Sequence, residues 1–138
     1  MADPISIATG IVGLTAFAIQ SSKALYEAIE NIKNNGRTIR ELKEETISLT
    51  KVLCSLEETV ALSEIDLSAL QVPLRRCGQL CQELSVLLGK CSAHSVNGRF
   101  SIRDFFASTY QSKDLTEFRS LIAAYKSTIA VALADANM

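Results

Sequence analysis

The fold is decided by the stretch from Ile5 to Ser22, which reads ISIATGIVGLTAFAIQSS and contains no charged residue. Asp3 and Pro4 precede it, and these residue types favour the N-cap and the first turn of a helix. The Asn-Asn-Gly sequence at 34–36 supplies residues that end helices, so we predict one helix over about residues 4–33. Its uncharged part is about 28 Å long, close to the hydrocarbon thickness of a bilayer.

Two interpretations of this stretch stay open on its pattern alone. Thr9, Thr15 and Gln20 are polar and argue against a permanent transmembrane helix. A helix that is apolar nearly all round is instead expected at the centre of a helical bundle. Small residues lie four positions apart at Ser6 and Gly10 and again at Thr9 and Gly13, and they would let another helix approach closely, in a bundle or in a membrane. The stretch is therefore either a buried core helix or a segment with a membrane role.

Three further long helices are predicted over about residues 37–62, 68–93 and 112–136, with a short helix over about 101–109. In each long helix the apolar residues recur alternately three and four positions apart, which is typical of helices that pack at a shallow angle. These apolar stripes are Ile39, Leu42, Thr46, Leu49, Leu53, Leu56 and Val60; Leu70, Leu74, Cys77, Cys81, Leu84, Leu88 and Cys91; and Leu115, Phe118, Ile122, Tyr125, Ile129 and Ala132.

The predicted fold class is all-α, and no stretch alternates as a strand would. The chain has 138 residues, 48% of them hydrophobic, which is enough to bury one core without disulfides or metals. Six glycines and two prolines leave few breaks, which favours long helices. We predict a single domain over 1–138, an up-and-down four-helix bundle with a short extra helix before the last long one.

The charge balance and the cysteines narrow the possible partners. Fourteen basic and fifteen acidic residues give no positive field, so we expect no nucleic-acid partner.

Three of the four cysteines, Cys77, Cys81 and Cys91, could form a zinc site with His94. Because those three lie on the apolar stripe of one helix, we expect buried reduced thiols instead, with no metal and no cofactor. Cys54, beside another stripe, is interpreted in the same way.

No residue pattern indicates an enzyme. His94 is the only histidine, lies in a predicted loop and has no evident nucleophile beside it. The glutamates of residues 37–62 alternate with lysines and are typical of a solvated helix face. The two glycines of the first helix do not follow a strand, so they form no phosphate-binding loop. The acidic start MADP also argues against a secretion signal.

Three segments carry a resemblance to a known family: DPISIATGIVGL at the start, ELKEETISLTKVL in the second helix and LTEFRSLIAAYKSTIAVAL at the end. Together they resemble the fungal HeLo-like N-terminal domain of NLR-like (STAND) proteins, over essentially the whole chain. Relatives often hold a Trp-Pro-like turn before the last helix, where this chain has SIRDFFAST. The resemblance implies a helical bundle related to the HeLo cell-death domain.

The resemblance also implies a function in programmed cell death, as in fungal innate immunity and heterokaryon incompatibility. The domain would be cytoplasmic, would oligomerise with itself and would release its first helix into plasma-membrane lipid when a downstream nucleotide-binding domain activates it. At rest, that helix would be core, screened by the other three. The alternative is a homotypic or adaptor interaction module with no membrane activity. The membrane-directed residues would be Ile5, Ile7, Ile11, Val12, Leu14, Phe17 and Ile19, with Gly10 and Gly13 as close-packing small residues.

Overall fold

The structure, a computed structural model, describes residues 4–32, 36–62, 67–93 and 115–136, without the side chains of 4–9, 62 and 91–93. These residues form four α-helices and one 3-10 turn, and they contain no strand. The elements are α1 (Pro4–Glu30), α2 (Arg37–Leu62), η1 (Ser68–Leu70), α3 (Gln71–Ala93) and α5 (Leu115–Ala136). The all-α bundle predicted from the sequence is confirmed. The short helix predicted over 101–109 lies outside the described residues.

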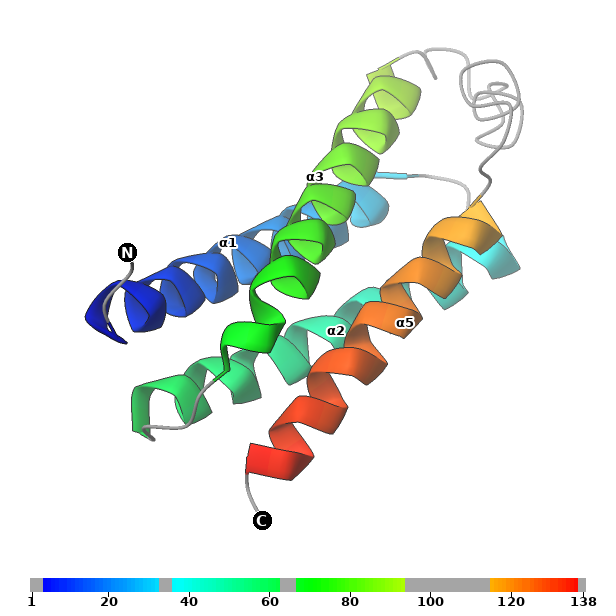
Figure 1. The fold of residues 1–138 in the computed structure, drawn as a ribbon. Coiled ribbons are helices and arrows are strands. Elements are labelled where there is room, and N and C mark those ends of the chain that lie inside the picture. The colour runs from blue at the N-terminus through cyan, green and yellow to red at the C-terminus, as the bar shows by residue number, and fades with distance from the viewer. Residues whose placement is uncertain (1–3, 33–35, 63–66, 94–114, 137–138) are drawn as a thin grey trace.

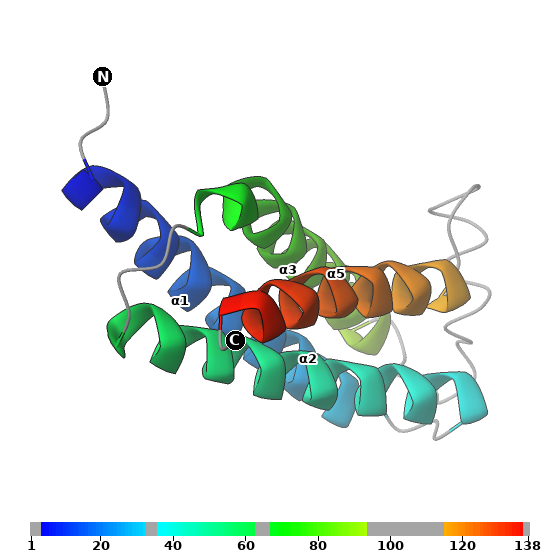
Figure 2. The same ribbon diagram turned by 60° about the horizontal axis from the view of Figure 1, so that its bottom comes forward.

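The helices alternate in direction along the chain, but chain order is not the order in space (Figure 1). α1 packs along α3 and along α2, and α2 packs along α5. α3 and α5 touch over a smaller area, while α2 and α3 hardly touch. The four helices therefore surround the core in the order α1, α2, α5, α3, as the second view also shows (Figure 2). Two neighbouring pairs, α1 with α3 and α2 with α5, are consequently parallel.

The expectation that the first helix lies at the centre, screened by three others, is wrong. α1 occupies one corner of the bundle and hardly touches α5. In a four-helix bundle every helix turns one face to the common core and another to solvent. The outward face of α1 carries Val12, Gly13 and Gln20, all exposed. The absence of charge on this face is therefore not a sign of burial. The face is exposed, and its residues are small or carry an amide.

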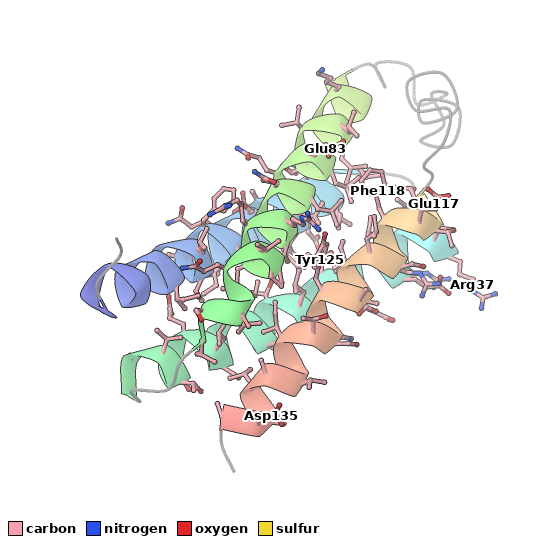
Figure 3. All side chains as sticks on the ribbon, in the orientation of Figure 1. Arg37, Glu83, Glu117, Phe118, Tyr125 and Asp135 are labelled. Carbon is pink, nitrogen blue, oxygen red and sulfur yellow. The ribbon has the colours of Figure 1, made fainter. Side chains whose placement is uncertain are left out.

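The core is built from the apolar stripes that the heptad spacing predicts. Leu42, Leu49, Leu53 and Leu56 of α2 are fully buried, and Leu74, Leu84 and Leu88 of α3 are equally inaccessible. From α5, Phe118 and Tyr125 point toward the interior (Figure 3), with Phe118 fully buried and Tyr125 packed against the core. Burial of each large apolar side chain contributes about 1.5–3 kcal/mol, so these stripes hold the helices together.

Two helix ends differ in detail from the expected ranges. α1 ends at Glu30, and the Ile32 amide donates to the Ile29 carbonyl at 3.1 Å, an i to i−3 bond that tightens a last turn. α3 begins at Gln71, directly after η1. Pro73 therefore lies in the first turn of α3, where its missing N–H leaves no helical hydrogen bond unmade. It marks the start of that helix.

Candidate functional site

The predicted membrane-directed residues of α1 divide between its two faces. Ile11 and Ile19 are buried in the core, at 3% and 6% exposure. Leu14 and Phe17 are half-buried, whereas Val12 is 50% exposed. Ile5 and Ile7 belong to α1, but their side chains lie outside the described set. The structure thus places only part of the predicted set in the core and leaves one valine on the surface.

The inner face of α1 also buries hydroxyl groups. Thr15 and Ser22 are almost inaccessible to solvent, and each hydroxyl donates to a backbone carbonyl one turn earlier, at 2.7 and 2.9 Å. Ser22 Oγ further lies 2.9 Å from Thr50 Oγ1 of α2, within hydrogen-bonding distance. These polar atoms are buried with their hydrogen bonds satisfied, so they add no desolvation penalty. They make the buried face of α1 less hydrophobic than that of a leucine-lined helix.

α1 packs tightly against α3 at Gly78. A Cβ atom placed on Gly78 would lie 2.4 Å from the ring of Phe17. Phe17 therefore packs on bare α3 backbone. Neither Gly10 nor Gly13 plays this part within the bundle: a Cβ at Gly10 would lie 3.6 Å from Gln71, and one at Gly13 would meet nothing within 4 Å. The sequence pattern did not single out Gly78, and its place directly after Cys77 of the α3 stripe was the available signal.

A polar cluster joins the end of α1 to the start of α2. Lys43 forms a salt bridge with Glu30, and its ammonium group lies 5.6 Å from the centroid of the Tyr26 ring. Hydrogen bonds from Lys43 and from the Tyr26 hydroxyl lower the pKa of Glu30. The hydrogen bond with Glu30 is also the main cause that raises the pKa of Lys43 and the pKa of Tyr26. The cluster fixes Tyr26 against α2.

A groove of about 630 Å³ lies between α1 and α2. Its lining is mostly apolar and includes Ile47 and Cys54, which lie off the α2 stripe that enters the core. Its lysines are Lys23 from α1 and Lys51 from α2, both exposed. The full lining consists of Lys23, Tyr26, Glu27, Ile47, Thr50, Lys51, Cys54 and Ser55. The groove was not predictable from the sequence, because its residues come from two helices that each look solvated on that side.

The described cysteines are free thiols. Cys77 and Cys81 are fully buried among the leucines of α3, as the apolar stripe indicates. A hydrogen bond with Cys77, together with burial, raises the pKa of Cys81, so this thiol stays protonated. Cys54 is half-buried and faces the groove. Cys91 and His94, the other members of the candidate zinc set, lie outside the residues whose side chains are described.

Ion pairs join α2 to α5. Lys126 Nζ lies 2.6 Å from Glu45 Oε1, and Arg119 Nε lies 3.8 Å from Glu41 Oε2. All four side chains are largely shielded, between 18% and 37% exposed. They fix the alignment of two parallel helices. Two glutamates of α2, Glu41 and Glu45, therefore face α5, although the sequence pattern placed them on a solvated face.

The described residues contain neither a membrane span nor a metal cluster. Judged by length and hydropathy together, none of the helices in the described ranges qualifies as a bilayer-spanning segment. Within the same ranges, no three His, Cys, Asp or Glu side chains gather in a way that could hold a metal ion.

Comparison with known families gives a match over nearly the whole chain. Residues 2–138 match the family described as "Pigment biosynthesis cluster protein PigL N-terminal", which covers all but the first residue of the chain. Neither the comparison with curated proteins nor the comparison with solved structures returned a match.

Proposed function

We propose, on the premise that this chain belongs to the PigL N-terminal family of HeLo-like fungal domains, that it is the membrane-targeting effector domain of a fungal NLR-like protein. In this proposal the domain is not an enzyme. It rests in the cytoplasm, and a downstream nucleotide-binding domain in the full-length protein triggers it. It then oligomerises, releases α1 into the plasma membrane and causes cell death.

The observation that carries this proposal is the chemistry of both faces of α1. Between Gly10 and Ser22 the helix has no charge on its inner face or its outer face. Its transfer from the bundle to lipid would therefore require no charge to leave water, which is the largest cost of inserting a helix. The buried hydroxyls of Thr15 and Ser22 already bond to carbonyls of the same helix, so those bonds persist when the helix leaves the bundle.

The contact between α2 and α5, which does not involve α1, supports the same proposal. Release of α1 would separate it from α2 and α3 and would leave the contact between α2 and α5 in place. The ion pairs of Glu41 and Glu45 with α5 would remain as well. The pair α2 and α5 would then remain as a scaffold, while α3 would lose its most extensive helix contact. A movable element and a scaffold are the parts that a two-state switch needs.

Val12 allows a charge test that separates folding from membrane insertion. Val12 is 50% exposed in the bundle, so Val12→Lys should leave the fold intact. A lysine at the bilayer centre costs about 2.5–3.5 kcal/mol on insertion scales, so dye leakage from anionic vesicles should fall by at least about tenfold. Leu14 is less suitable for this test, because it is half-buried against the core and a charge there would also harm folding.

Val131→Lys is the matched control. Val131 is 62% exposed on α5, so it receives the same charge at a similarly exposed site outside the proposed membrane helix. Circular dichroism should show both variants folded, with leakage lost only in Val12→Lys. Equal leakage by the two variants would contradict the membrane role of α1. If the folded wild-type domain leaves vesicles intact at every protein concentration, the interaction-module alternative replaces the proposal.

A further inference from the structure

The groove between α1 and α2 is lined by apolar side chains that do not all belong to the hydrophobic core. Ile47 lies on the groove side of α2, one position away from the core residue Thr46, and it is not part of the core cluster. Cys54 lies two turns further along the same side and is also only half-buried. The methylene stems of Lys23 and Lys51 extend this apolar surface. The bundle therefore leaves an apolar trough on its outer side that no described residue fills.

The rim of this trough is positively charged and available to a ligand. Lys43 and Lys126 elsewhere in the bundle form salt bridges, whereas neither Lys23 nor Lys51 forms one with any described residue. The two lysines come from different helices and line the same cavity. Glu27 is the single carboxylate of the lining, so the groove has an excess of one positive charge. A ligand with one anionic group complements this rim.

The groove is also preformed. The Tyr26 ring on its wall is fixed by Glu30 and Lys43. Thr50 Oγ1 in its lining donates a 2.9 Å hydrogen bond to the Thr46 carbonyl and lies 2.9 Å from Ser22 Oγ of α1. A ligand would therefore lose little free energy in ordering these walls. The volume, about 630 Å³, falls within the range of about 300–1,000 Å³ that is usual for small-molecule sites.

We propose that this groove binds a fatty carboxylate, with its chain along Ile47 and Cys54 and its carboxylate between Lys23 and Lys51. An alkyl chain satisfies the apolar trough, and each buried methylene contributes to affinity. A single carboxylate satisfies the two unpaired lysines. Because the ligand would contact both helices, it would also hold α1 against α2. The site stands on this geometry alone and does not depend on the proposed membrane activity.

Cys54 provides a built-in reporter of occupancy. The probe is dodecanoate, used below its micelle concentration with the whole 138-residue chain, and the readout is alkylation of Cys54 by iodoacetamide, mapped by peptide mass spectrometry. Bound dodecanoate should slow Cys54 alkylation in a saturable manner, by about fivefold or more. Acetate has the head group without the chain, and dodecyltrimethylammonium has the chain with the opposite charge. Neither should protect Cys54.

Variants of the rim test the assignment of the head group. Exposed ion pairs are each worth a modest amount, so K23Q/K51Q should weaken dodecanoate protection by about five- to tenfold. Lys90→Gln is the control, because Lys90 is an exposed lysine of α3 outside the groove. Ser55→Trp, at an exposed lining position, should abolish saturable protection by filling the trough.

Specific results would overturn the proposal. Equal protection by the cationic amphiphile, or equal weakening by Lys90→Gln, would show that the rim lysines do not select the ligand. Alkylation that appears at Cys77 or Cys81, which are fully buried in the native bundle, would show that dodecanoate unfolds the protein instead of binding it. An unchanged rate of Cys54 alkylation over the whole range of dodecanoate concentrations would exclude the site.

Discussion

At the scale of single residues, the pair Phe17 and Gly78 shows how one missing side chain sets a helix contact. The aromatic ring of α1 occupies the space that a Cβ on α3 would need, with ring atoms at 2.4 and 2.5 Å from that position. Glycine normally weakens a helix interior by about 0.5–1 kcal/mol relative to alanine. Here that cost is offset by the packing of a ring against backbone, which brings α1 and α3 close.

Gly78→Ala should therefore destabilise the domain. The new methyl group would force the half-buried Phe17 ring outward, and overpacking of this kind costs about 1–3 kcal/mol. This loss exceeds the gain in helix propensity, so we expect a net decrease of about 1–2 kcal/mol in the free energy of unfolding. Chemical denaturation followed by circular dichroism measures it.

Gly89→Ala is the matched control for that substitution. Gly89 lies in the same helix, and a Cβ there would meet nothing within 4 Å. It should raise the stability by about 0.5–1 kcal/mol. Combined with Phe17→Ala, the Gly78→Ala change should lose its penalty, because the clash is gone. An equal effect of Gly78→Ala with and without the ring would refute the assigned contact.

At the scale of elements, charged side chains fix how α2 is aligned with α1 and with α5. The α1–α2 pair is closed by Tyr26, Glu30 and Lys43, and the α2–α5 pair by the ion pairs of Glu41 and Glu45. Ion pairs at exposed or partly exposed sites contribute only modestly to stability, because water screens the charges. The apolar stripes already hold these helices together. The ion pairs therefore select one alignment of the two helices along each other.

Replacement of Glu30 should remove a stabilisation that depends on pH. The pKa of Glu30 is lowered in the folded protein, mainly by its hydrogen bond with Lys43. Its contribution is therefore fully present above its ordinary pKa of 4.5 and is lost as the pH falls through the lowered value. Wild type should be more stable than Glu30→Gln at neutral pH, and the difference should shrink in acid.

The alkaline side has the opposite sign. The raised pKa values of Tyr26 and Lys43 mean that their contributions are present below their ordinary values of 10.0 and 10.5 and are lost as the pH rises further. Urea denaturation across the pH range tests both limits. Glu27→Gln, which removes an α1 carboxylate without a salt bridge among the described residues, is the control and should leave stability at neutral pH unchanged. A pH-independent effect of Glu30→Gln would contradict the role of this cluster.

At the scale of the whole molecule, the order of helices around the core leaves one face of α1 uncovered. Val12 and Gly13 lie on that face, and the described part of the bundle places nothing against them. This face is the surface through which the proposed oligomer would form. Small residues at such a position allow a second copy to approach closely.

A bulky residue at Gly13 should therefore weaken self-association. We expect sedimentation velocity over a concentration range to show species above the monomer for the wild type and a shift toward monomer for Gly13→Leu. Gly89→Leu is the control, because it adds the same side chain at an open position on α3. A wild type that stays monomeric at high concentration, with and without vesicles, would contradict this prediction, as would an equal shift in the control.

The sequence by itself determined the long helices and the inner faces of α2, α3 and α5. Burial in a helix follows the spacing of apolar residues three and four positions apart, which is a local property of the chain. Spacing alone therefore identifies Leu42, Leu53, Leu74 and Leu84 as core residues of α2 and α3, and all four are fully buried. The same local pattern places Cys77 and Cys81 in the core.

Only the tertiary structure decided which helices are neighbours. Four amphipathic stripes can surround one core in more than one order, and local periodicity is the same in each of them. The corner position of α1, the contact of Phe17 with Gly78 and the groove shared by Lys23 and Lys51 all depend on that order. Each joins residues far apart in the chain, so the physical cause lies in how the surfaces of different helices fit, which no single helix encodes.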